Sequence, residues 1–120
     1  MKPAALDRMA AEAVARAQRE LPREVLEAAM EVRVILEGSP GPDVLAEGFE
    51  PDLLGLFAGR TVGDPGDPEP PRIHLYTANL WHCVGGDVEA FREESRLTYL
   101  HELGHYLGWG EDQVAARGLD

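Results

Sequence analysis

An α+β domain is predicted for this chain of 120 residues on three grounds. Apolar residues recur at helical spacing near both ends of the chain, whereas its middle carries short runs of branched side chains bounded by glycine and proline. A long helical pattern in the second half ends in residues that can bind a metal ion. We therefore expect a single compact domain over residues 1–120, with a small central sheet of about three or four strands packed against helices.

Two helices are predicted at the N-terminus, over residues 4–20 and 22–29. In the first, apolar side chains such as Leu6, Met9 and Val14 recur at helical spacing, with charged residues between them. Pro22 suits the first turn of the second helix, because its missing amide hydrogen would have no partner there.

Three strands are predicted in the middle of the chain, over residues 31–38, 53–62 and 72–77. The second pattern is the weakest, because Gly55 and Gly59 reduce the side-chain packing of a strand. The breaker-rich sequences GSPGPD and GDPGDPEPP separate these strands and are interpreted as loops.

A long helix is predicted over residues 88–107, with Asp87 as its N-cap. Gly108 stands where a left-handed residue commonly ends a helix, and the sequence EDQVAARG after it suits a short terminal helix. The expected buried stripe of the long helix consists of Phe91, Leu97, Leu100, Leu103 and Leu107.

Charge and composition argue against some partners. The formal net charge is −11, so nucleic acid is not expected as a partner, because phosphate binding needs a basic face. No segment has the continuous apolar core of a membrane span or a targeting signal, so we expect no membrane association. The single cysteine, Cys83, excludes a disulfide within the chain and fits a cytoplasmic protein.

The sequence HELGHYLG, residues 101–108, carries the chemistry. His101 and His105 are four residues apart, so on a helix they lie one turn apart on the same face, where one zinc ion can take both imidazoles. Glu102 is rotated away from the pair, so it can miss the metal and still reach a water molecule bound to it. By chance, HExxH followed by this glycine would arise in about one or two chains in a thousand of this composition.

Two further pairs of residues could act near such a site. His82 and Cys83 are adjacent, but without a paired CxxC motif a loop histidine and a partly buried thiol are the better interpretation. His74 and Tyr76 share one strand face and would suit stabilisation of an oxyanion, although a surface or core position is favoured for both.

These patterns together resemble the small zincin-like metallopeptidases of bacteria and archaea, which are often described as minimal metalloproteases. The resemblance covers a helix leading to LP, the segments VRVILEGSP, LLGLFAG and PRIHLY, and HELGHYLG followed by acids. It implies a compact α+β fold around a HExxHxxGxx(D/E) zinc site and a peptidase activity. The longer metzincin signature does not fit, because its third histidine is absent and no methionine follows Met30.

A third protein ligand is expected, since a catalytic zinc site takes three ligands and leaves one position open. Glu111, ten residues after His101, stands where the third histidine of the longer motif would be. Asp112 is the rival, and either acid can instead favour the first turn of the terminal helix. We therefore predict one zinc ion per chain, held by His101, His105 and Glu111.

The resulting hypothesis is a zinc-dependent metallopeptidase with Glu102 as general base, acting on a peptide or an unfolded protein. The substrate is expected to lie extended beside an exposed strand, with RIHLYT as the candidate. Two alternatives stay open at this point. One is a non-catalytic zinc-binding structural or interaction domain, and the other is a zinc hydrolase of a non-peptide amide.

Overall fold

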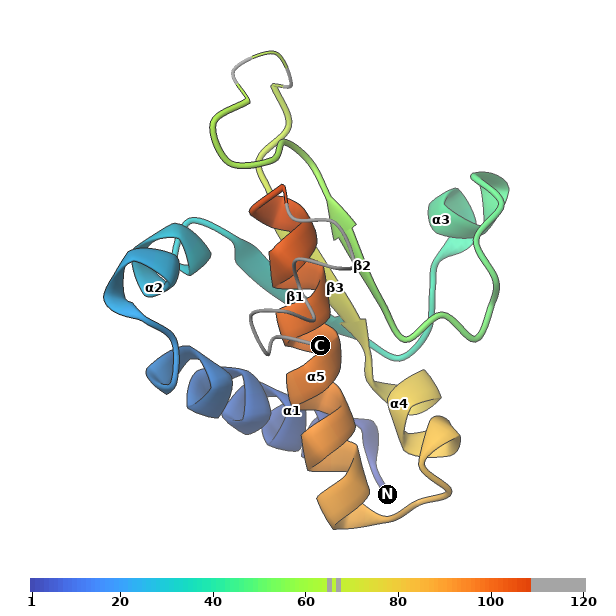
Figure 1. The fold of residues 1–120 in the computed structure, drawn as a ribbon. Coiled ribbons are helices and arrows are strands. Elements are labelled where there is room, and N and C mark those ends of the chain that lie inside the picture. Colours follow the sequence, from blue (N-terminus) through green and yellow to red (C-terminus); the bar gives the residue numbers. More distant parts are fainter. Residues whose placement is uncertain (65, 67, 109–120) are drawn as a thin grey trace.

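Five helices and three strands make up the part of the chain that the computed structural model describes, residues 1–64, 66 and 68–108. In chain order they are α1 (Pro3–Arg19), α2 (Arg23–Ala29), β1 (Arg33–Glu37), α3 (Pro42–Ala46), β2 (Gly55–Ala58), β3 (Arg72–Tyr76), α4 (Thr77–Cys83) and α5 (Val88–Tyr106). The predicted α+β fold is confirmed (Figure 1). The terminal helix predicted after Gly108 lies outside the described residues.

The three strands form one mixed sheet in the order β1-β3-β2. β1 runs parallel to β3, with Val34 opposite Ile73, and β2 runs antiparallel to β3, with Phe57 also opposite Ile73. β3 is therefore the central strand, and both its edges are paired. This contradicts the expectation that RIHLYT offers a free edge to a peptide, because strand order depends on contacts distant in sequence.

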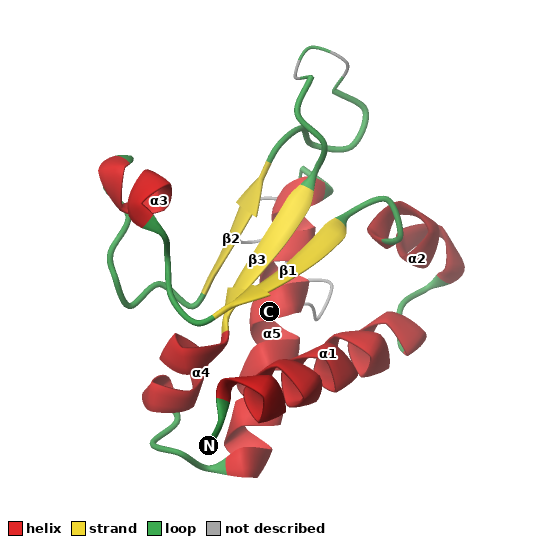
Figure 2. Cartoon of the chain, turned by 180° about the vertical axis from the view of Figure 1, so that it is seen from behind, coloured by secondary structure: helices red, strands yellow, loops and turns green. Residues whose placement is uncertain are grey.

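Helices α1 and α5 pack together and α5 covers one face of the sheet, whose strands lie in front of α5 in Figure 2. Ile73 and Leu75 on β3 are completely buried, as are Phe91, Tyr99 and Leu103 on α5. These side chains form the centre of the core, and they hold α5 in a fixed place against the sheet.

The predicted buried stripe of the long helix is only partly correct. Phe91, Leu100 and Leu103 are buried, as expected, but Leu97 and Leu107 are only partly buried. Leu97 lies one helical turn before His101, on the same side of α5. Both residues line a hollow on this side, so core side chains do not cover it completely.

Two short helices, α3 and α4, are not predicted from the sequence. α3 has five residues, too few to show a helical period, and Pro42 stands in its first turn. α4 begins at Thr77, directly after β3, so no glycine or proline marks the change from strand to helix. Within the described residues, no helix is both long and apolar enough to cross a membrane.

Candidate metal centre

The helix that carries HELGHYLG begins and ends as its sequence predicts. The Asp87 side chain accepts a hydrogen bond from the backbone amide of Ala90, at 2.9 Å, and so caps the first turn of α5. At the other end Gly108 has a φ of 77°, the left-handed conformation that glycine adopts without strain. Its amide donates to the carbonyl oxygen of His105, at 3.0 Å. The last full turn of α5 is therefore the turn that carries His105.

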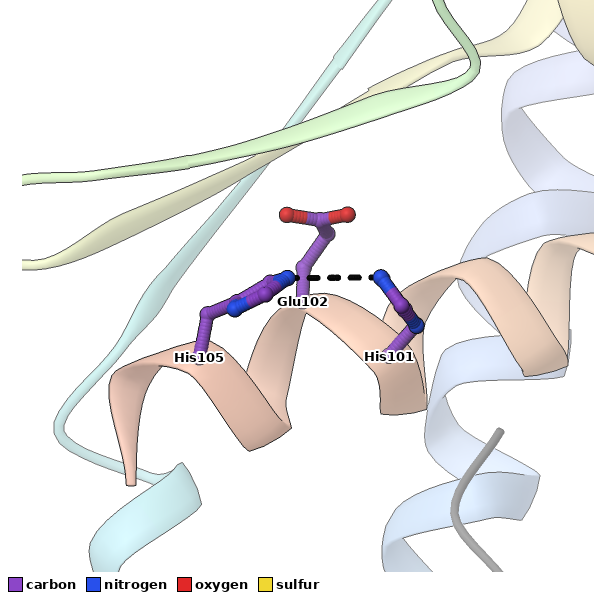
Figure 3. A group of neighbouring side chains, drawn as sticks. All are labelled: His101, Glu102 and His105. Atoms are coloured by element: carbon purple, nitrogen blue, oxygen red, sulfur yellow. Dashed lines mark hydrogen bonds between the residues drawn. The ribbon is translucent and has the colours of Figure 1, made fainter. Parts of the chain in front are cut away.

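His101 and His105 project from one side of α5 and face each other (Figure 3). Their Nε2 atoms are 3.3 Å apart, and their rings meet edge to face, with centroids 4.9 Å apart. Both residues are half-buried, as is Glu102 between them. Each of the three offers one ligand atom such that all three atoms lie within 4.8 Å of one another.

The spacing of the two imidazoles fits a shared zinc ion. With zinc–nitrogen bonds of about 2.0–2.1 Å and a tetrahedral angle between them, two ligand nitrogens stand about 3.3–3.4 Å apart. The observed Nε2–Nε2 distance of 3.3 Å agrees with this value. Imidazole nitrogens are also ligands that zinc binds readily. The residues present therefore fit the ion that the motif implies.

Glu102 is directed to the sheet rather than along the helix. Its carboxylate points toward β2 in Figure 3, and its Oε1 accepts a hydrogen bond from the backbone amide of Phe57, at 3.0 Å. This contact joins the helix to an edge strand and fixes the direction of the carboxylate. The carboxylate of a mobile surface glutamate would have no fixed direction.

Gly55 allows β2 to come this close to α5. A Cβ atom on Gly55 would lie 2.6 Å from Cγ2 of Thr98 and 3.1 Å from the carbonyl oxygen of His74. Any larger residue would therefore push the strand away from the helix. Beyond β2, the amide of Val62 donates to the carbonyl oxygen of Tyr106, at 2.8 Å, which attaches the following loop to the last turn of α5.

The structure brings together the three residues that the motif predicts, His101, Glu102 and His105. The two candidates for the third ligand, Glu111 and Asp112, lie outside the described residues. Which of them approaches the histidines is therefore still a prediction.

His74 and Tyr76 lie on β3, where His74 is half-buried and Tyr76 is buried. Because Ile73 and Leu75 are buried in the core, strand alternation places His74 on the opposite face, where its Nδ1 lies 2.5 Å from Oε1 of Glu37. Its ring stacks on that of Tyr76. Burial, followed by the negative charges of Glu37 and Glu102, raises the pKa of the Tyr76 hydroxyl. These contacts agree with the favoured interpretation, a surface or core position.

His82 and Cys83 are not part of the group of His101, Glu102 and His105. His82 and Cys83 are exposed in the last turn of α4, so the expectation of a loop histidine and a partly buried thiol is wrong. Tyr99 is buried, and its hydroxyl accepts a hydrogen bond from Gln18 of α1, at 3.1 Å. Burial raises the pKa of this hydroxyl, and the Gln18 contact partly opposes the shift.

Two features beside the motif were not found from the sequence. The first is the amide of Phe57, a backbone group that no residue pattern indicates. The second is a hollow of about 420 Å³ that His101 and Glu102 border. On α5 the hollow is also lined by Glu94, Leu97 and Thr98. These residues precede His101 at helical spacing, so their place on the same side of the helix could be predicted from the sequence.

This chain resembles known proteins at the level of a family. A search of curated protein sequences gives no match. The family model of the zincin-like metallopeptidases matches residues 29–119, which is more than half of the chain and includes all three strands and the whole of α5. With the histidine pair and the adjacent glutamate on that helix, this match shows that the chain belongs to the zincin-like metallopeptidase family.

Proposed function

We propose that this chain is a zinc-dependent peptidase in which His101 and His105 hold the metal ion and Glu102 is the general base. The observation that carries the proposal is the arrangement on α5. Two imidazole Nε2 atoms stand 3.3 Å apart, the separation that a tetrahedral zinc ion requires, and a carboxylate held from β2 lies beside them. Membership of the zincin-like metallopeptidases supports both the metal and the reaction class.

A zinc ion bound by His101 and His105 would supply Lewis-acid chemistry at a peptide carbonyl. Glu102 accepts the proton of the attacking water and passes it to the nitrogen of the departing amine. The hydrogen bond from the Phe57 amide holds one oxygen of the Glu102 carboxylate, so the other oxygen has a defined direction for this transfer.

Glu111 is proposed as the third protein ligand, with Asp112 as its rival, because two histidines alone leave a catalytic zinc site short of one ligand. A zinc titration of Glu111→Ala and Asp112→Ala separates the two residues. We expect the Glu111 variant to lose far more zinc affinity, and the reverse order would assign the role to Asp112.

The proposed substrate is a peptide in extended conformation, paired with the outer edge of β2. Leu54 and Leu56 turn their backbone groups toward β3, so alternation directs those of Gly55 and Phe57 outward, to the side of the histidines. The Phe57 amide donates to Glu102, so the outward groups that a peptide backbone would use are the amide and carbonyl of Gly55 and the carbonyl of Phe57. The strand that presents this edge is β2, in place of the expected β3.

The substitution Glu102→Gln tests the function. It keeps the size of the side chain and removes its basicity, so zinc content and thermal stability should stay near the parent values. Hydrolysis of an unstructured protein or a diverse peptide library should fall by roughly a hundredfold to ten-thousandfold. Glu93→Gln is the control, because it removes the same charge from the exposed side of the same helix.

Equal hydrolysis by the parent and Glu102→Gln, at equal zinc loading, would contradict the proposed role of Glu102. Full zinc loading without hydrolysis of any library member in either protein would favour a non-catalytic zinc-binding domain.

A further inference from the structure

The hollow beside the histidine pair has apolar walls and one acidic residue. Leu53 and Leu54 border it from the segment before β2, and Leu97 and Thr98 border it from α5. Glu94 also lines it, two helical turns before His101. His101 and Glu102 close the other end, so a peptide bond cleaved there would have a neighbouring side chain that enters this hollow.

The acidic residue of the hollow differs from the other acids of α5. Glu89 and Glu93 are exposed, and each forms an ion pair with the arginine three residues later, Arg92 and Arg96. Glu94 is half-buried, and it forms no ion pair with any residue of the described part of the chain. A partly desolvated carboxylate without a cation is a favourable partner for a positively charged ligand group.

The dimensions of the hollow favour a long side chain. His101 is the seventh residue after Glu94, which corresponds to about 10 Å along a helix. A short apolar side chain would end over Leu97 and Thr98, whereas the aliphatic part of lysine or arginine would lie along the leucines and bring its charged group to Glu94.

We propose that Glu94 is a specificity-determining residue, and that the preferred peptide carries lysine or arginine next to the cleaved bond. This inference rests on the proposed peptidase function and adds the class of substrate. The net charge of −11 also favours a basic peptide, but only the position of Glu94 selects one residue of that peptide.

The test uses zinc-loaded full chain and three peptides that differ at the residue on one side of a cleaved bond: lysine, norleucine or glutamate. Norleucine keeps the unbranched stem of lysine and lacks its charge. We expect kcat/KM to be roughly five- to tenfold higher for lysine than for norleucine, as for a partly buried ion pair. Glu94→Gln should remove this difference, and Glu94→Lys should make the glutamate peptide the better substrate.

Glu93→Gln is the matched control, since it removes one negative charge at the neighbouring position, where the side chain is paired with Arg96 on the exposed side. It should keep the preference for lysine. A norleucine peptide that is cleaved as well as the lysine peptide by the parent would overturn the inference. An equal loss of preference in Glu93→Gln and Glu94→Gln would also overturn it, because the preference would then come from the net charge alone.

A binding measurement separates this inference from the peptidase proposal. Calorimetry with zinc-loaded Glu102→Gln measures the affinity for the same peptides without turnover. Tighter binding of the lysine peptide, lost when Glu94→Gln is added, supports the specificity role even if the parent cleaves none of the three. Equal binding of the lysine and norleucine peptides, or no binding of either, overturns it.

Discussion

The two long faces of α5 differ in burial and in chemistry. One face consists of buried side chains, such as Tyr99, Leu100 and Leu103, which belong to the core formed with α1 and the sheet. The other carries Glu94, Leu97, His101, Glu102 and His105, all of them half-buried. The buried face holds the helix in place. The half-buried face therefore keeps its side chains in fixed positions and is still accessible to a ligand. A small domain can therefore carry a candidate metal centre on a helix that its core holds in place.

The largest expected effect on stability is that of a core truncation on α5. Leu103→Ala removes a completely buried side chain and should lower the free energy of unfolding by about 2–5 kcal/mol. Leu97→Ala makes the same chemical change on the half-buried face and should cost roughly 1 kcal/mol or less. Urea unfolding of both variants provides the comparison. Equal losses would show that the two faces of the helix do not differ as the structure indicates.

A smaller effect is expected where the strand approaches the helix. Gly55→Ala places a Cβ atom 2.6 Å from Cγ2 of Thr98, which should cost about 1–3 kcal/mol and displace β2 from α5. The amide proton of Phe57, which donates to Glu102, should then exchange faster with solvent. Gly41→Ala is the control, because a Cβ atom there has no neighbour within 4 Å.

The double variant sharpens this prediction. Thr98→Ser removes the Cγ2 atom with which the new methyl group would clash, so part of the lost stability should return in Gly55→Ala/Thr98→Ser. Strictly additive effects of the two substitutions would contradict the proposed contact between the strand and the helix.

The parts of this structure that depend on local pattern were predictable from the sequence. The spacing of His101 and His105 gave the face of the helix that carries the pair, and Asp87 and Gly108 gave the beginning and end of that helix. Each of these inferences needs only residues within a few turns of one another.

The parts that depend on contacts distant in sequence were not predictable. RIHLY is the central strand because it pairs with segments on both sides, and its own residues do not determine this. In the sequence Gly55 indicates a weak strand, whereas in the structure its missing side chain lets β2 approach Thr98. The hydrogen bond from Phe57 to Glu102 follows from that approach, so it too became visible only in three dimensions.

The zinc content of the purified chain tests the central claim, that the half-buried face of α5 is a metal centre, most directly. Native mass spectrometry of the untagged protein and of His105→Ala gives the number of ions per chain. We predict one zinc ion in the parent and none in the variant, because the pair of Nε2 atoms 3.3 Å apart provides two of its ligands. A parent that takes up no zinc, or a His105→Ala variant that keeps full occupancy, would contradict the assignment.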